Sequence, residues 1–191
     1  MLTDLFKIGI WQVDLDLDND SIANYCHTLQ QQDSVGRIVS NQGGWQSKPL
    51  VGEHPHLNTL FTSIIEQGVQ YANSIGLTTS PTTIDDIWVN MNKQHAYNSA
   101  HCHPGSILSG VYYVHNTKLG GDIVFDCPNS ALINGYWWNA IDKEVTDYTS
   151  SQHTIQSSIG KLILFPSWLT HFVQPNNHQQ EERISISFNL N

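Results

Sequence analysis

Hydrophobic and polar positions divide the chain into a first part with helical spacing and a second part of short alternating or apolar runs. In the first part, apolar residues recur every three or four positions over residues 19–32 and 55–75, which predicts two amphipathic helices. The first begins in a polar run, Asn-Asp-Ser, that is typical of a helix N-terminus. The second opens with Pro55 and is followed by Gly76, a common pair of start and stop signals. Residues 40–47, SNQGGWQS, lie between them and are predicted to form a loop.

From residue 84 onward the chain consists of short runs broken by Gly, Pro, Asn and Asp. Many short strands with turns between them predict an antiparallel β sandwich or barrel. With two helices preceding it, we expect one domain over residues 1–191, in which the helices cover an outer face and a ligand lies between the sheets. The predicted strands are IWVNMN (87–92), ILSGVYYV (107–114), DIVFDC (122–127), ALINGYWW (131–138), KLILFP (161–166), HFVQP (171–175) and RISISFNL (183–190).

The last of these runs has the clearest alternation. Apolar residues at 184, 186, 188 and 190 alternate with Arg183, Ser185, Ser187 and Asn189, so one face of the strand is apolar and the other polar. An edge strand with its polar face in water is one interpretation, and a strand whose polar face lines a pocket is the other. The run 87–92 alternates in the same way, with Trp88, Asn90 and Asn92 on its polar side.

Charge and cysteine content narrow the function classes. Eight Lys and Arg stand against 17 Asp and Glu, a formal charge of -9, and no segment collects basic residues. We therefore expect no nucleic-acid partner and no anionic membrane partner. Three cysteines without regular spacing do not indicate a disulfide framework, and the first 20 residues resemble neither a signal peptide nor a membrane span. The expected location is the cytoplasm, and the oligomeric state is not indicated.

Histidines and one arginine supply the candidate chemistry. His101-Cys102-His103 places two imidazoles two residues apart, which on a strand would project from one face and reach one metal ion. Arg183 is one of only two arginines and lies in a strand with an aliphatic opposite face. A guanidinium there needs an anion, either a bound carboxylate or a protein carboxylate.

The order of these motifs resembles a known family. HCH, SGVYYV, GGDIVF, GKLILFPSWLTHFVQP and RISISF follow one another as in the double-stranded β-helix core of the iron and 2-oxoglutarate oxygenases, particularly the prolyl-hydroxylase-like branch. With SNQGGWQS, the chain is similar over nearly its whole length to bacterial and phage proteins of that superfamily. The resemblance implies a jelly-roll, cupin-like core over residues 84–191, buttressed by a helical region over residues 1–83.

The resemblance also implies roles for individual residues and a reaction. Fe(II), 2-oxoglutarate and O2 would be required, with ascorbate as a candidate reductant, and the products would be succinate, CO2 and a hydroxylated substrate. A peptidyl or free amino acid side chain is suggested by the branch alone, and a phage-encoded protein would act in the host cytoplasm. The implied iron ligands are His101 and His171, and the residues for the distal carboxylate of 2-oxoglutarate are Arg183, Ser185 and Tyr113. The alternation of residues 87–92, not the resemblance, makes Asn90 and Asn92 candidates for its inner carboxylate or for the substrate, with polar residues in water as the alternative.

The chain departs from the family at one position. His103 stands where the pattern has Asp or Glu, which would make the ligand set neutral and the metal centre one charge more positive. His103 could be the third ligand, a residue beside a two-His centre, or the mark of a relative without turnover, and Asp122 or Asp126 could supply a carboxylate instead.

Two other classes of protein remain open. One is a cupin-like metal-binding protein or dioxygenase with three His ligands that does not use 2-oxoglutarate. The other is a structural or virion-associated β protein. Four tryptophans are candidates for a substrate cleft or for the core: Trp45, Trp137, Trp138 and Trp168.

Overall fold

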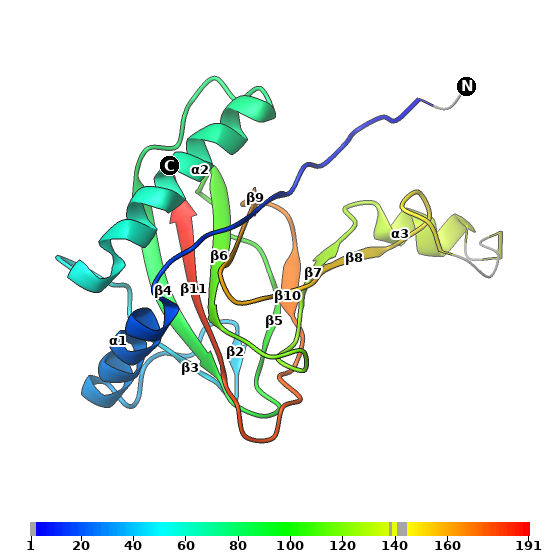
Figure 1. The fold of residues 1–191 in the computed structure, drawn as a ribbon. Helices are drawn as coiled ribbons and strands as arrows, with labels where there is room; N and C mark the ends of the chain where they lie inside the picture. The colour runs from blue at the N-terminus through cyan, green and yellow to red at the C-terminus, as the bar shows by residue number, and fades with distance from the viewer. Residues whose placement is uncertain (1–2, 138, 141–144) are drawn as a thin grey trace.

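The computed structural model describes residues 3–137, 139–140 and 145–191, and shows two facing β-sheets with two long helices on one side (Figure 1). The helices are α1 (Asn19–Gln32) and α2 (Asn58–Ser74), with short helical segments η1 (Pro55–Leu57), α3 (Ser130–Leu132) and η2 (Ile133–Trp137). The strands are β1 (Trp11–Asp14), β2 (Asn41–Gln42), β3 (Trp45–Gln46), β4 (Ile84–Asn92), β5 (Tyr97–His101), β6 (Leu108–His115), β7 (Ile123–Asp126), β8 (Gln152–Ile155), β9 (Lys161–Pro166), β10 (His171–Val173) and β11 (Arg183–Leu190).

The strands form a six-stranded sheet in the order β1-β9-β6-β11-β4-β3 and a five-stranded sheet in the order β2-β5-β10-β7-β8. Every pair of neighbouring strands is antiparallel. Strands distant in sequence thus become neighbours, as in a jelly roll. The prediction of a mainly β, double-stranded β-helix fold with N-terminal helices is confirmed.

Both predicted helices form, and both pack on the outer face of the six-stranded sheet. The bounds of α1 agree with the prediction, although its N-cap is Asp18, whose side chain accepts a hydrogen bond from the Ser21 N–H at 3.0 Å. The second segment begins with the 3-10 turn η1 before α2. Apolar residues of α1 and α2 share one core cluster with β4, β6, β9 and β11, and burial of this shared surface holds the helices in place.

β11 lies in the middle of the six-stranded sheet, between β6 and β4, so the edge-strand interpretation is wrong. Its apolar residues, including Ile186 and Phe188, are fully buried in the cluster shared with the helices. Its polar face turns toward the other sheet, where Arg183 and Ser185 are also buried. The alternation in sequence therefore separates a helix-facing side from a pocket-facing side.

Several strand assignments differ from the sequence prediction. Residues 131–137 form α3 and η2, not a strand, and Trp138 lies outside the described residues. The predicted loop 40–47 contains β2 and β3, which pair with β5 and β4. β1, β5 and β8 were not predicted, because they are short or polar and are held largely by pairing with neighbouring strands. No helix in the described part of the chain is long and apolar enough to cross a membrane.

Candidate active site

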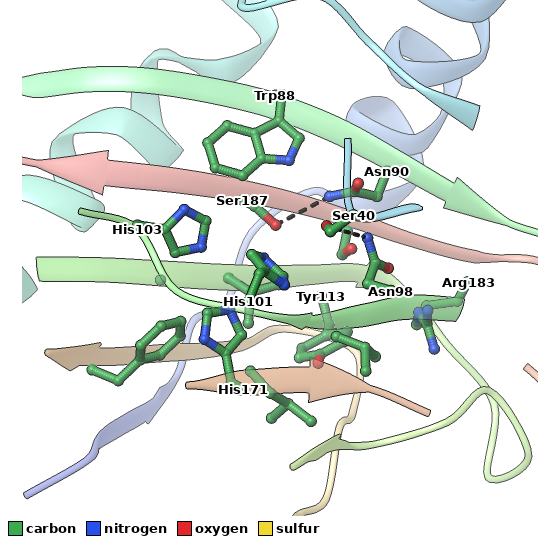
Figure 2. Close-up of a pocket in the computed structure, with 16 residues that line it drawn as sticks. Ser40, Trp88, Asn90, Asn98, His101, His103, Tyr113, His171, Arg183 and Ser187 are labelled. Carbon is green, nitrogen blue, oxygen red and sulfur yellow. Dashed lines mark hydrogen bonds between the residues drawn. The ribbon is translucent and has the colours of Figure 1, made fainter. Parts of the chain in front are cut away.

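Three histidines meet between the two sheets. His101 ends β5 and is the direct Cα partner of His171, the first residue of β10. His103 joins them, and one ligand nitrogen from each ring lies within 4.8 Å of the others. The ring centroids are 4.5 Å apart for His101 and His171, 4.9 Å for His101 and His103, and 5.2 Å for His103 and His171 (Figure 2). This spacing suits three nitrogen ligands around one metal ion.

His103 reaches the cluster by a different route from the one expected. β5 ends at His101, so His103 is not on the strand, and the argument from strand alternation does not apply to it. Its backbone N–H donates to the Ser167 carbonyl at 2.8 Å, which holds the turn after β5 against the β9–β10 connection. Its ring lies 5.8 Å from the centre of the Trp88 ring on β4.

Backbone carbonyls orient two of the three rings. Nδ1 of His101 lies 2.7 Å from the Ser99 carbonyl oxygen, and Nδ1 of His171 lies 2.9 Å from that of Leu169. A carbonyl can only accept, so each Nδ1 carries the hydrogen and the lone pair of each neutral ring is on Nε2. A metal ligand is normally fixed by a partner of this kind on its other nitrogen.

Burial keeps the three rings neutral. It lowers the pKa of His103 to about 4, with a smaller contribution from His101, and the pKa of His171 to about 3. It also lowers the pKa of His101, against a smaller opposing effect of the Ser99 carbonyl. Neutral imidazoles have the free lone pairs that metal binding requires.

The other end of the same pocket holds Arg183, with Tyr113 between it and the histidines (Figure 2). Arg183 is 1% exposed, and its Nη1 donates to the carbonyls of Gly120 and, at 3.0 Å, Gln174. Its Nη2 is buried without a hydrogen-bond partner, as is the Tyr113 hydroxyl. Burial raises the pKa of Tyr113, so the hydroxyl remains a donor. An unsatisfied guanidinium nitrogen with an unsatisfied hydroxyl in the same pocket is a site for an anion, and a carboxylate suits these two donors.

The Gly120-Gly121 turn makes room for this guanidinium. Gly121 has φ +86°, and a Cβ there would lie 2.3 Å from the Gln174 carbonyl oxygen and 2.8 Å from Arg183 Nη1. A Cβ at Gly120 would lie 1.7 Å from the Asn116 side-chain oxygen. Gly121 is therefore explained by the close packing around Arg183, and Gly120 by the close approach of the Asn116 side chain.

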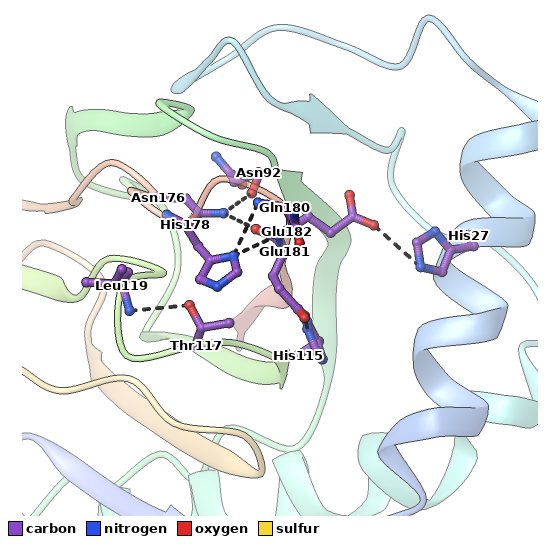
Figure 3. Close-up of polar contacts among 10 residues, drawn as sticks. All are labelled: His27, Asn92, His115, Thr117, Leu119, Asn176, His178, Gln180, Glu181 and Glu182. Atoms are coloured by element: carbon purple, nitrogen blue, oxygen red, sulfur yellow. Dashed lines mark hydrogen bonds and ion pairs between the residues drawn. The ribbon is translucent and has the colours of Figure 1, made fainter.

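Asn176 holds the loop that leads into β11 (Figure 3). It is 1% exposed, and its Nδ2 donates to the carbonyls of Asn92 at 2.9 Å and Glu181 at 2.8 Å. Its Oδ1 accepts from the His178 N–H at 2.9 Å. Because Glu181 is two residues before Arg183, these bonds fix the backbone that carries the guanidinium.

The structure brings seven of the eight predicted site residues to one pocket and leaves Asn92 out. Asn92 is fully buried, but its amide lies under Gly44, where a Cβ would be 2.9 Å from Nδ2. The pocket residues are His101, His103, His171, Arg183, Ser185, Tyr113 and Asn90.

Neither alternative carboxylate belongs to the histidine cluster. Asp122 accepts from the N–H and the hydroxyl of Ser157, and Asp126 accepts from the Gln152 side chain. Asp122 instead acts electrostatically on Arg183, raising its pKa against the larger lowering by burial.

Among the residues of the pocket that sequence reasoning did not predict, four have side chains that can form hydrogen bonds: Ser40, Trp88, Asn98 and Ser187. Trp88 and Ser187 could have been found, because they share the polar sides of β4 and β11 with Asn90 and Ser185. Ser40 and Asn98 carry no such signal. Of the tryptophans considered, Trp45 is buried and donates to the Asp33 carbonyl, whereas Trp137 and Trp168 are about half exposed, at 51% and 55%.

Comparison with known proteins gives one family. The model of the family described as "Putative 2OG-Fe(II) oxygenase" matches residues 86–189, more than half of the chain. No curated protein matches the sequence.

Solved structures share the fold at low sequence identity. A Pseudomonas putida prolyl-4-hydroxylase has a TM-score of 0.66 at 15% identity, over 96% of this chain and 92% of that one. A viral collagen prolyl hydroxylase from Paramecium Bursaria Chlorella virus-1, solved as a 2OG complex, has a TM-score of 0.60 at 14% identity, over 95% of this chain and 94% of that one. A non-heme alpha ketoglutarate dependent carbocyclase from nogalamycin biosynthesis has a TM-score of 0.64 at 10% identity, over 96% of this chain and 79% of that one.

Proposed function

The chain belongs to this family of 2OG-Fe(II) oxygenases, and from that premise we propose that it is a dioxygenase whose iron is held by His101, His103 and His171. In this proposal Arg183, Ser185 and Tyr113 bind the distal carboxylate of 2-oxoglutarate. The reaction is hydroxylation of a substrate, with formation of succinate and CO2.

One observation carries the proposal: a single pocket has a cluster of neutral imidazoles at one end and unsatisfied donors at the other. The imidazoles suit a transition-metal ion such as iron. Arg183 Nη2 and the Tyr113 hydroxyl lack partners and suit a carboxylate. A 2-oxo dicarboxylate carries a metal-binding group at one end and a carboxylate at the other, so it matches both halves.

Each residue has a defined task in this arrangement. The carbonyls of Ser99 and Leu169 hold His101 and His171 in the tautomer that presents Nε2. Arg183 binds and orients the cosubstrate, with its own position fixed by Gly120 and Gln174. The apolar side chains of Ile123, Val173 and Phe165 line the same pocket and exclude water from it. Bound iron would supply the oxygen activation that couples oxidation of 2-oxoglutarate to oxidation of a C–H bond.

The three histidines form an uncharged set of metal ligands, whereas the family pattern has a carboxylate at the position of His103. With His103 in place of a carboxylate, the metal centre carries one more positive charge. This favours, as a second candidate, a three-His metal protein that works without 2-oxoglutarate. The unsatisfied donors of Arg183 and Tyr113 argue for the cosubstrate, because a metal-binding module has no need for a buried anion site.

Fold alone does not select the substrate. Prolyl hydroxylases and a carbocyclase share this fold, so hydroxylation of a peptidyl or free amino acid side chain is a proposal from the family branch.

The proposal is tested by calorimetric titration of 2-oxoglutarate into the anaerobic Fe(II)-loaded protein. Glutarate is the matched control, since it keeps both carboxylates and lacks the oxo group that chelation needs. We expect iron-dependent binding of 2-oxoglutarate, weakened at least about tenfold by Arg183→Leu. Equal binding of glutarate, or binding that does not require the metal, would contradict the proposal.

A further inference from the structure

One wall of the pocket, between the histidines and Arg183, carries two pairs of amide and hydroxyl side chains (Figure 2). Asn90 Nδ2 donates to Ser187 Oγ at 3.1 Å, and Asn98 Nδ2 donates to Ser40 Oγ at 3.3 Å. The four residues come from β4, β11, β5 and the segment just before β2. Four separate parts of the chain thus bring the same chemistry to one surface.

Asn90 shows that this wall is incomplete without a ligand. Its side chain is buried, 4% exposed, and its Oδ1 has no hydrogen-bond partner. A buried polar atom left in that state costs roughly 1–3 kcal/mol. A hydrogen-bond donor supplied by a bound molecule would remove this cost.

An amide paired with a hydroxyl still presents both donors and acceptors to a ligand. When Asn90 Nδ2 donates to Ser187, the Asn90 Oδ1 remains as an acceptor and the Ser187 hydroxyl hydrogen as a donor. If the amide is turned over, the amide N–H groups become the donors and the Ser187 oxygen becomes the acceptor, so both kinds of group are still present. Asn98 and Ser40 have the same complementarity.

The distal carboxylate and the methylene groups of the cosubstrate do not account for this wall, and the Asn90→Leu variant below tests the remaining alternative, that Asn90 binds the inner carboxylate. Between its carboxylate end and its chelating end, 2-oxoglutarate has two methylene groups, which make no hydrogen bonds. Among the described residues that line the pocket, Arg183 alone carries a formal charge, and it lies at the far end. A charged substrate group at the amide wall would therefore have no side chain of opposite charge beside it.

We propose that Asn90 with Ser187, and Asn98 with Ser40, form a substrate subsite for a neutral group that both donates and accepts hydrogen bonds. A carboxamide and a hydroxyl group share this chemistry, whereas a carboxylate only accepts and an ammonium only donates. Trp88 lines the same pocket beside His103 and gives the substrate an apolar surface next to the reacting position. The inference rests on the proposed function and names the substrate class of that site.

The test uses zinc-loaded protein saturated with 2-oxoglutarate, in which no turnover occurs and the anion site of Arg183 is filled. Four small probes are titrated separately: acetamide, ethylene glycol, acetate and methylammonium. Nuclear magnetic resonance follows the Asn90 side-chain amide and the Trp88 indole N–H. We expect saturable shifts with acetamide or ethylene glycol, and none with acetate or methylammonium. Whichever neutral probe binds more tightly identifies the amide or the hydroxyl as the recognised group.

Two variants separate recognition from structural support. Asn90→Leu should weaken binding of the neutral probe about three- to tenfold, the effect of one lost hydrogen bond. Asn90→Asp should shift the preference toward methylammonium, which loss of structure would not do. Asn177→Asp, the same change at an exposed position outside the pocket, should leave the preference unchanged.

The outcomes for the subsite and for the proposed function are distinct. If zinc and 2-oxoglutarate bind but neither neutral probe does, the subsite is overturned and the proposed function stands. An Asn90→Leu variant that loses affinity for 2-oxoglutarate and keeps its affinity for the probe assigns Asn90 to the cosubstrate, which also overturns the subsite. Failure of zinc and 2-oxoglutarate to bind contradicts the proposed function itself, and the subsite with it.

Discussion

Gly121 lies so close to the guanidinium of Arg183 that any Cβ at this position would stand 2.8 Å from Nη1. The same atom would stand 2.3 Å from the Gln174 carbonyl oxygen, which accepts a hydrogen bond from Arg183. One glycine in the β6–β7 connection therefore sets the position of the anion-binding residue of β11.

Substitution of Gly121 tests this coupling. Gly121→Ala should weaken 2-oxoglutarate binding by about tenfold or more, because Arg183 must move, and should leave iron affinity unchanged. Gly76→Ala is the matched control, since Gly76 has a similar φ of +78° and nothing within 4 Å of its Cβ position. Both variants should lose stability, on the order of 1 kcal/mol, from the positive φ alone. Equal cosubstrate affinities in the two variants would show that Gly121 does not position Arg183.

The Fe(II) affinities of variants at the three histidines show whether His103 is a ligand. His101→Ala and His171→Ala should each lower Fe(II) affinity by more than about 100-fold, since even the partners of ligands contribute about 10–100-fold. His103→Ala should also lower the affinity, and His103→Asp should restore it by supplying the missing carboxylate. Equilibrium competition with a chelator measures each variant.

His115→Ala is the control for these metal-binding measurements. His115 pairs with Glu181 at 2.8 Å outside the histidine cluster, so its loss should leave iron affinity unchanged. If His103→Ala binds iron as the wild type does, then His103 is a residue beside a two-His centre.

Asn176 should act on cosubstrate binding through the loop before Arg183. Asn176→Ala removes the donor to the carbonyls of Asn92 and Glu181 and the acceptor for His178, which should cost roughly 1–3 kcal/mol of stability. The same variant should raise the dissociation constant of 2-oxoglutarate while iron binding remains normal. The exposed neighbour Asn177→Ala should change neither quantity. A stability loss without any loss of cosubstrate affinity would limit Asn176 to a structural role.

The metal-free protein should lose stability as the pH falls below about 6.5. Burial lowers the pKa of His103 to about 4 and of His171 to about 3, from 6.5. Between those values the unfolded chain binds protons that the folded chain does not, so the free energy of unfolding decreases as the pH decreases. By pH 5 the loss should be on the order of 2 kcal/mol for a buried ring.

Urea unfolding at pH 7 and pH 5, with a chelator present, measures this dependence. His171→Gln should reduce it, because glutamine does not titrate, and the part due to His103 should remain. A wild-type free energy of unfolding that is the same at both pH values would contradict the burial of neutral imidazoles.

The sequence predicts the strands and helices whose own residues show a regular spacing of apolar and polar positions. The alternation in β11 and β4 predicts both of their faces, and the stripe over residues 19–32 predicts α1. The apolar content of residues 131–138 predicts a strand, but α3 and η2 have no buried residues, so their apolar side chains are not packed in a core.

Part of the site was not predictable because it depends on contacts between distant segments. His103 reaches the cluster through a backbone bond to Ser167, and Ser40 reaches the pocket because β2 pairs with β5. Asn176 has no sequence signal, and its role appears only when the carbonyls of Asn92 and Glu181 converge on it. Asn92 was predicted to line the pocket from the alternation of residues 87–92, but its amide lies against Gly44 outside the pocket.

The central claim is that iron and 2-oxoglutarate bind together between the histidines and Arg183. Anaerobic titration of 2-oxoglutarate into the Fe(II)-loaded protein, followed by the weak visible charge-transfer band of the chelate, measures this directly. We predict a saturable band that is absent in His171→Ala and requires at least about tenfold more cosubstrate in Arg183→Leu. Iron binding without any band would contradict the claim and favour a three-His metal protein that does not use 2-oxoglutarate.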